Sequence, residues 1–286
     1  MFNLANILSG FNLLAGITSI ILAFSGRLEA AVIAIFVGAI LDFLDGMVAR
    51  LMKQQSELGK QLDSLADIVT FGVAPGVIVF ILLIISGAWD IINETGGNLD
   101  NLWFEGTMGY SVHYWVSVYL NDLVGNMNPY YPAHFYGWYM FLPFIGLIIP
   151  FFSLFRLAKF NLDERQTQGF IGLPTPANSI FFASFGLILW DAFGENNWKT
   201  VMSMTLIKDQ VIMSFVIIFS LLLISEIRLF SLKFRDFKWR GNEIRYGFLL
   251  ISALIIVLLY VWALPIIVLL YILMSIISNK FKTEKK

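Results

Sequence analysis

The sequence of 286 residues contains no cysteine, only two histidines and few charged residues. The absence of cysteine excludes disulfide bonds, thiolate metal sites and cysteine nucleophiles. Charged residues make up 14% of the chain, against roughly a quarter in ordinary soluble domains. Hydrophobic residues make up 58%, and the mean hydropathy is +0.77. A soluble domain could not bury this much apolar surface, so the composition predicts that a lipid bilayer is the solvent.

Apolar stretches near membrane-spanning length recur along the chain, and we count eight of them. The last two are short and are separated by Ala263-Leu264-Pro265, which predicts a tight hairpin. We therefore expect an all-α fold, a polytopic membrane helix bundle of about eight transmembrane helices, built as a single domain over residues 1–286. The expected spans cover residues 10–25, 28–50, 61–87, 136–158, 174–192, 209–230, 246–262 and 264–279.

The positions of Lys and Arg predict how these spans are oriented, because basic residues gather on the cytoplasmic side. With the N-terminus inside, all of the 19 basic residues except Arg27, Lys199 and Lys208 fall in inner segments. The longest interruption, residues 88–134, has no Lys or Arg, and we interpret it as an extracytoplasmic insertion. We expect a multi-pass integral membrane protein with both termini cytoplasmic, in a bacterial inner membrane, and without a nucleic-acid partner.

Four aspartates interrupt the second and third expected spans, where acidic residues are costly. They form two pairs, three and four residues apart, so each pair shares one helix face. Because the two helices are antiparallel neighbours joined by a short turn, all four carboxylates should converge near the cytoplasmic ends of the spans. These residues are Asp42, Asp45, Asp63 and Asp67.

This cluster needs positive charge, since each acidic residue costs about 2.5–3.5 kcal/mol at the centre of a membrane on insertion scales. Arg50 alone cannot supply it, whereas two divalent ions can. Hard oxygen ligands favour Mg²⁺ or Mn²⁺, and a pair of such ions forms a clamp suited to displacement at phosphorus. Gly46 and Ala49 leave space beside the carboxylates, and Arg50 is a natural partner for phosphate oxygens. A divalent-cation transporter using the same cluster is the alternative, although transporters usually carry paired interrupted helices in two halves.

From Asp42 to Asp67 the sequence spells D-x2-D-G-x2-A-R-x8-G-x3-D-x3-D. This pattern resembles the signature of the CDP-alcohol phosphotransferase family, whose members transfer a phosphatidyl-type group from a CDP-linked lipid to an alcohol and release CMP. The resemblance implies that the four aspartates hold two metal ions and that Asp67 is also the base for the acceptor hydroxyl, a choice that spacing alone does not make. It also implies a homodimer. The residues that would line the CDP site are Gly46, Ala49, Arg50 and Gly59.

Three further stretches resemble the serine-accepting branch of this family: LDSLADIVTFGVAPG at 62–76, RLAKFN at 156–161 and GFIGLPTPAN at 169–178. Ser64 and Ile68 stand where the phosphatidylglycerophosphate branch usually has Pro and Lys, which argues against glycerol phosphate as acceptor. The resemblance implies that CDP-diacylglycerol and L-serine are the substrates, taken up from and released into membrane lipid, with Ser64 in the substrate site. Another acceptor alcohol or an archaeal-type lipid donor stays open.

The carboxylate of serine would need a cationic partner. Arg156, at the inner end of the fourth expected span, is the candidate for this pairing, and Asn161 is expected to add a hydrogen bond. The alternative for Arg156 is an anchor that reaches lipid phosphates at the membrane surface.

Overall fold

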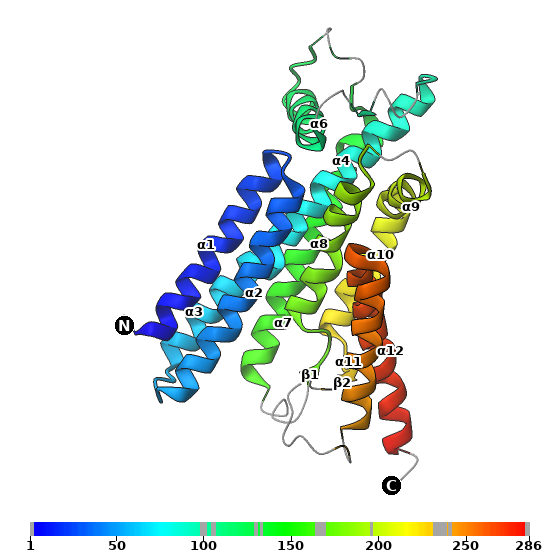
Figure 1. Cartoon of the computed structure of the whole chain (residues 1–286). Helices are drawn as coiled ribbons and strands as arrows, with labels where there is room; N and C mark the ends of the chain where they lie inside the picture. Colours follow the sequence, from blue (N-terminus) through cyan, green and yellow to red (C-terminus); the bar gives the residue numbers. More distant parts are fainter. Residues whose placement is uncertain are drawn as a thin grey trace.

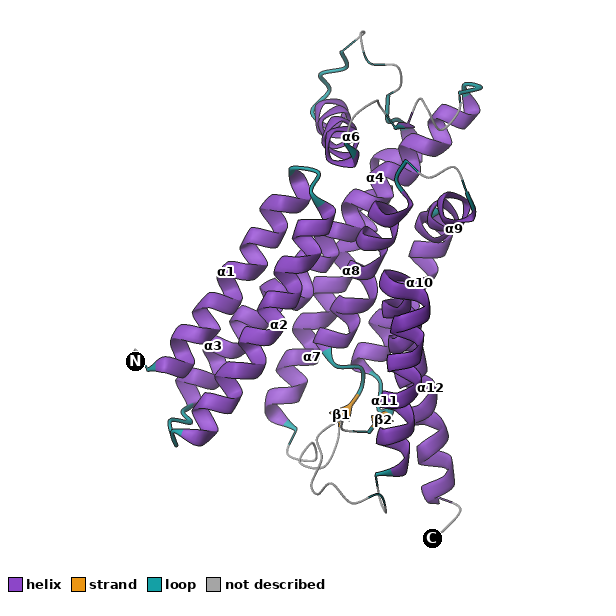
Figure 2. Cartoon of the chain, viewed as in Figure 1, coloured by secondary structure: helices purple, strands orange, loops and turns teal. Residues whose placement is uncertain are grey.

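The computed structural model is almost entirely helical (Figure 2). It describes residues 3–97, 102–103, 107–128, 131, 134–163, 170–194, 197–230, 239 and 242–283. Several of the basic residues that were assigned to the inner side lie outside the described residues. These are Arg165, Lys233, Arg235, Lys238, Arg240, Lys285 and Lys286.

The elements follow one another along the chain as a series of long and short helices with one small pair of strands (Figure 1). The α-helices are α1 (Leu4–Phe24), α2 (Leu28–Leu51), α3 (Glu57–Asp67), α4 (Ala74–Glu94), α6 (Met108–Leu123), α7 (Ile148–Leu162), α8 (Thr175–Ala192), α9 (Trp198–Ile207), α10 (Asp209–Ile224), α11 (Glu243–Leu259) and α12 (Ala263–Thr283). The remaining turns are the π-helical η1 (Ile68–Val73) and the 3₁₀ turns η2 (Gly137–Met140), η3 (Leu142–Leu147) and η5 (Tyr260–Trp262). Strands β1 (Phe170–Ile171) and β2 (Arg228–Leu229) pair antiparallel, with Phe170 opposite Leu229.

Helix α4 forms the centre of the bundle. Every residue from Ala74 to Ala88 is buried, and α1, α6, α7, α8, α9 and α10 all contact it. A helix that is apolar on all sides is stable only when other helices surround it. Together with α3 and η1 it makes one helical segment of 38 residues, Glu57–Glu94, which therefore links the two ends of the molecule.

Helix α1 buries its small residues and exposes its large ones. The buried positions follow helical spacing and are Ala5, Ser9, Asn12, Gly16, Ser19 and Ala23. Phe11, Leu14 and Ile21 are exposed at 52%, 54% and 62%. Small residues at helix interfaces let backbones approach closely in membrane proteins, while large apolar side chains face lipid. This arrangement accounts for the close packing of α1 on α2, α3 and η1.

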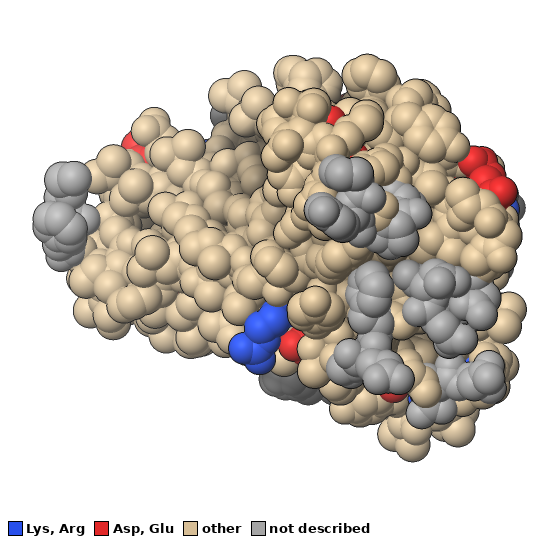
Figure 3. All heavy atoms as spheres, turned by 90° about the horizontal axis from the view of Figure 1, so that it is seen from above, with Lys and Arg blue, Asp and Glu red and all other residues tan. Residues whose placement is uncertain are grey.

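Helix α6, within the region interpreted as an insertion, packs against the end of α4. The Trp115 indole Nε1 donates to the Leu102 carbonyl at 2.9 Å, and the Tyr119 hydroxyl donates to the Met140 carbonyl at 2.7 Å. Asp122 is buried and accepts a hydrogen bond from the Phe135 backbone N–H at 2.8 Å. Seen from this end, charged side chains are few and scattered (Figure 3).

The expected count of eight spans is not confirmed. Five helical segments are long and apolar enough to cross a membrane, and the pair α9 and α10, bent by 57°, would make a sixth. Helix α8 falls outside this set because polar residues, including Asn178 and Asp191, lower its hydropathy. Residues Glu243–Ser278 are counted as one candidate span by length and composition. The chain nevertheless turns at Tyr260, where φ is 51°, and α12 packs against α11. The several apolar helices support a multi-pass membrane protein, while the cytoplasmic position of the termini stays a prediction.

The packing of α1 on η1 predicts that Gly16 cannot accept a side chain. A Cβ there would lie 2.5 Å from the Thr70 Oγ1 atom and 2.8 Å from the Thr70 Cα atom, whereas a Cβ at Gly10 would have no neighbour within 4 Å. Gly16→Ala should destabilise the protein by about 1–3 kcal/mol. Gly10→Ala, on the same helix, should be neutral or stabilise by up to about 1 kcal/mol. The measurement is the thermal unfolding midpoint in detergent; equal shifts in the two variants would contradict this packing.

Candidate functional site

Helices α2 and α3 bring three carboxylates together near the ends of the helices. Asp42 lies in the last turns of α2, and Asp63 and Asp67 lie one turn apart on α3. The side chain of Ser56 caps α3 by accepting from the Gly59 backbone N–H at 3.0 Å, which fixes where the helix begins. One carboxylate oxygen from each of Asp42, Asp63 and Asp67 lies within 4.8 Å of the other two. We refer to these three residues as the aspartate cluster.

Asp45 lies beside the aspartate cluster as a charged neighbour of all three residues, although its oxygens are not among those within 4.8 Å of one another. It is only 4% exposed, and its Oδ2 atom accepts a hydrogen bond from the Ser9 hydroxyl of α1 at 2.7 Å. Sequence reasoning placed all four aspartates in one group and did not identify Ser9. Helix α1 therefore supplies a polar contact to the face of α2 that carries Asp42 and Asp45.

Asp67 is also held from α1. The Asn12 side-chain Nδ2 donates to Asp67 Oδ1 at 3.1 Å, and the Thr70 hydroxyl donates to the Asn12 carbonyl at 2.9 Å. Asn12 is fully buried, and Thr70 lies in the π-helical turn η1 that begins directly after Asp67. Sequence reasoning missed Asn12 too. The signal was present, because Ser9 and Asn12 fall on the small-residue face of α1.

A cavity of about 730 Å³ lies beside these carboxylates, between the ends of α1, α2, α3 and α7. Six residues expected from the sequence line it, and the others are new. The expected ones are Asp45, Gly46, Ala49, Arg50, Gly59 and Asp63. The new ones are Ala5, Asn6, Ser9, Gln54, Gln55, Ser56, Glu57, Lys60 and Phe160. With Arg50 and Lys60 on its wall, the cavity offers two cations to an anionic ligand.

The glycines in this wall keep the cavity open. A Cβ at Gly59 would lie 3.0 Å from the Asn6 Oδ1 atom and 3.2 Å from the Ser56 Oγ atom. A Cβ at Gly46 would lie 3.6 Å from the Arg50 Nη1 atom. A side chain at Gly59 would therefore press on Asn6, while one at Gly46 would take up the space in front of Arg50.

Ser64 and Asn161 contact each other rather than the cavity. The Asn161 side-chain Nδ2 donates to the Ser64 Oγ atom at 2.8 Å, and the Lys60 ammonium donates to the Asn161 carbonyl at 2.8 Å. These bonds tie the end of α7 to α3. Both residues thus lie next to Lys60, which does line the cavity.

Arg156 lies one layer behind the cavity wall. It is 3% exposed, its Nε donates to the Leu173 carbonyl at 3.1 Å, and its guanidinium carbon is 5.2 Å from the centre of the Phe160 ring. Phe160 lines the cavity, whereas Arg156 does not. The structure therefore brings Arg156 near the site without placing it on the lining.

The side chains of the aspartate cluster fit a divalent metal ion. The Asp63 Oδ1 atom is buried without a hydrogen-bond partner among the described residues. Carboxylates this close together repel one another unless a cation lies between them. Their ligand atoms are all hard oxygens, and such a set suits Mg²⁺ or Mn²⁺ rather than zinc.

Comparison with known proteins identifies a family model and several named relatives that this chain resembles. Residues 2–94 match the family model described as CDP-alcohol phosphatidyltransferase. A Bacillus subtilis protein named CDP-diacylglycerol–serine O-phosphatidyltransferase is 28% identical over 58% of this chain and 64% of its own length. A Helicobacter pylori protein of the same name is 25% identical over 82% of this chain and 73% of its own length. An archaetidylserine synthase from Methanothermobacter thermautotrophicus is 29% identical over 64% of this chain and 58% of its own length.

The chain thus covers less than two thirds of the Bacillus and Methanothermobacter relatives. The family match is more local, and it spans α1 to α4, which carry all four aspartates. On these matches, the part of the chain that holds the aspartate cluster is similar to the CDP-alcohol phosphatidyltransferase family.

Proposed function

We propose that the protein transfers a phosphatidyl group from CDP-diacylglycerol to the hydroxyl of L-serine, giving phosphatidylserine and CMP. The observation that carries this proposal is the aspartate cluster beside a cavity of about 730 Å³ with Arg50 and Lys60 on its wall, inside the segment that matches the family. The names of the Bacillus and Helicobacter relatives support serine as the acceptor. The site must then bring the diphosphate of CDP-diacylglycerol and the hydroxyl of serine together inside an apolar helix bundle.

In this reaction the serine hydroxyl oxygen attacks the phosphorus that bears the diacylglycerol. A new P–O bond forms, the P–O bond to CMP breaks, and the hydroxyl proton passes to a base. Asp42, Asp45, Asp63 and Asp67 would hold two divalent ions, Mg²⁺ or Mn²⁺, which when bound neutralise the diphosphate so that a hydroxyl can attack it.

The residues of the chain have separate tasks in this scheme. Asp67 takes the proton, and Asn12 holds its carboxylate in place through the 3.1 Å hydrogen bond. Arg50 and Lys60 face the phosphates from the cavity wall, and Gly46 and Ala49 leave room for the nucleotide beside them. Arg156 is the proposed partner of the serine carboxylate, beside Phe160 but not on the cavity lining, and Ser64 and Asn161 position Lys60.

The lipid core of the donor has a second candidate. The name of the Methanothermobacter relative, archaetidylserine synthase, supports the same chemistry on an archaeal-type lipid. Incubation with CDP-diacylglycerol or its archaeal counterpart, a divalent ion, and serine, glycerol 3-phosphate or inositol would distinguish these reactions by the CMP released. We also propose that the site opens to the cytoplasm, that residues 88–134 form an outer insertion and that the protein is a homodimer.

Loss of one carboxylate from the proposed metal site should stop the reaction. Asp42→Asn, Asp45→Asn and Asp63→Asn should each lower CMP release more than about 100-fold, because even outer partners of a metal site are worth about 10–100-fold. A chelator should do the same to the unmodified protein. Glu29→Gln is the matched control, since Glu29 lies at the opposite end of the same helix beside Arg27. Full activity in excess chelator would remove the proposed role of the carboxylates.

Removal of the proposed base should act on chemistry more than on binding. Asp67→Asn keeps the size of the side chain but cannot take a proton, so CMP release should fall by about 10²–10⁴-fold. Binding of CDP-diacylglycerol, measured separately by equilibrium titration, should weaken far less. If release and binding fall in parallel, Asp67 is a metal ligand alone.

Acceptor choice can be tested at Arg156. Arg156→Lys keeps the charge but loses the two-pronged geometry, so the KM for serine should rise roughly ten- to a hundredfold. Serinol, which lacks the carboxylate, should be a poor acceptor for the unmodified protein and should lose little more in the variant. Equal losses for serine and serinol would show that Arg156 supports the fold through Leu173 and Phe160.

A further inference from the structure

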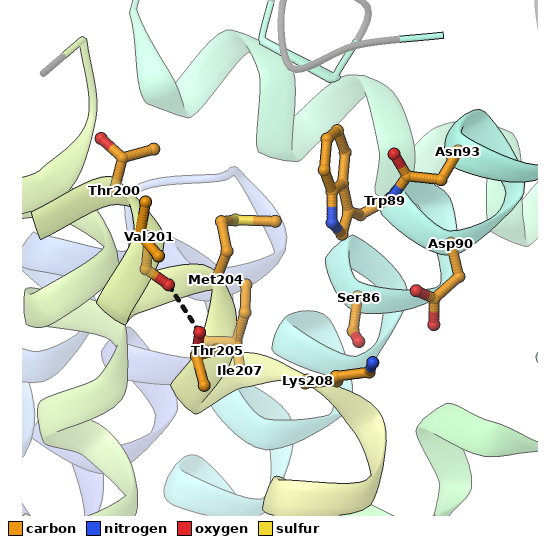
Figure 4. Close-up of a pocket in the computed structure, with 10 residues that line it drawn as sticks. All are labelled: Ser86, Trp89, Asp90, Asn93, Thr200, Val201, Met204, Thr205, Ile207 and Lys208. Atoms are coloured by element: carbon orange, nitrogen blue, oxygen red, sulfur yellow. Dashed lines mark hydrogen bonds between the residues drawn. The ribbon is translucent and has the colours of Figure 1, made fainter. Parts of the chain in front are cut away.

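A second cavity, of about 350 Å³, lies at the other end of the bundle from the aspartate cluster, where α4 meets the bent pair α9 and α10 (Figures 1 and 4). None of its lining residues belongs to the proposed transfer site. They are Ser86, Trp89, Asp90, Asn93, Thr200, Val201, Met204, Thr205, Ile207 and Lys208.

Two opposite charges face this cavity, and each is the other's charged neighbour. Lys208 lies at the 57° bend, between the end of α9 and the start of α10, and Asp90 lies on α4. Among the described residues, neither side chain takes part in a hydrogen bond or an ion pair. Neighbouring carboxylates are already occupied: Glu94 accepts from the hydroxyls of Tyr136 and Tyr139 at 3.1 and 3.0 Å, and Asp209 accepts from the Gln210 backbone N–H at 2.7 Å.

A buried hydroxyl adds a third, independent feature. Ser86 is only 2% exposed, and in the described part of the chain its hydroxyl has no hydrogen-bond partner. Ser86 and Asp90 are four residues apart and share one face of α4. In Figure 4 the Ser86 hydroxyl and the Lys208 ammonium point into the same space, below Asp90. The Ser86 hydroxyl, the Lys208 ammonium and the Asp90 carboxylate thus give one ligand three polar contacts in the same cavity.

The rest of the lining is apolar and opens outward. Trp89 stands over the charged groups, and Val201 and Met204 of α9 lie across from it (Figure 4). Val201 is 67% exposed, and its neighbour Met202 is 48% exposed. The polar cavity therefore continues into an apolar surface on a helix that belongs to a candidate membrane span.

We propose that this cavity binds the headgroup of a zwitterionic aminophospholipid. The lipid phosphate pairs with Lys208 and accepts from the Ser86 hydroxyl, the ammonium pairs with Asp90 beside the Trp89 ring, and the acyl chains follow the exposed face of α9. A ligand with one charge of each sign can pair with both groups at once. The cavity volume of about 350 Å³ suits a headgroup and not a whole lipid, so the acyl chains would lie on the apolar surface outside the cavity. This proposal is independent of the transfer reaction.

The test is a titration of the full chain in detergent with phosphatidylethanolamine or phosphatidylglycerol, with bound lipid counted by native mass spectrometry. Lys208→Gln should weaken the binding of both lipids about tenfold or more, because both carry a phosphate. Asp90→Asn should weaken only phosphatidylethanolamine, since phosphatidylglycerol has no ammonium. Lys208→Arg should keep the binding, which separates loss of charge from loss of fold.

Controls and outcomes follow from the same cavity. Lys199→Gln on α9 and Glu29→Gln on α2 remove charges outside it and should change neither lipid. CMP release should stay unchanged in the Asp90 and Lys208 variants, so this test and that of the transfer reaction can fail separately. Unaltered lipid preference in Asp90→Asn would overturn the proposal. Equally tight binding of free phosphoethanolamine would also overturn it, because the site would then serve a soluble ligand.

Discussion

Carboxylates repel one another, and this repulsion is strongest where water is scarce. The aspartate cluster holds oxygens from three side chains within 4.8 Å of one another in an apolar bundle. The surrounding helices must therefore keep α2 and α3 from moving apart. Helix α1 does so through its small face. Ser9 and Asn12 bond to Asp45 and Asp67, and Gly16 lets Thr70 approach the backbone closely enough to bond to Asn12. A cation bound in the cluster would be attracted by all three carboxylates and would offset the repulsion between them.

The central helix α4 connects the aspartate cluster to the opposite end of the bundle. Because α4 continues from α3 through η1, the segment that holds Asp63 and Asp67 is the same segment that ends at Asp90 and Glu94. Its middle is buried on every side by other helices. The two cavities therefore lie at opposite ends of one packed helical rod, with polar groups confined to its ends.

Helical spacing was enough to predict that the aspartate pairs share faces and that Gly46 and Ala49 leave space beside them, while Gly59 came from the family resemblance. It could not predict Ser9 and Asn12, because the usual pattern is inverted in a membrane: the face of α1 that is buried is the small and polar one. Phe160 and Lys60 were missed because they meet only through the contact of α7 with α3, which leaves no local pattern. The span count is not confirmed, because the polar residues of α8 lower its hydropathy and because α11 and α12 count as one apolar segment.

The π-helical turn η1 sets the angular relation between the two ends of the central segment. A π turn contains one residue more than an α turn, and η1 lies directly between Asp67 and the first turn of α4. In a regular α-helix each residue advances the face by about 100°. Removing one residue from Ile68–Val73 would therefore turn α3 by roughly that angle relative to α4 and point Asp63 and Asp67 away from Asp42. The extra residue thus fixes the rotation of α3 about its axis relative to α4. The segment can then be apolar on all sides in α4 while its first turns direct Asp63 and Asp67 toward Asp42 of α2.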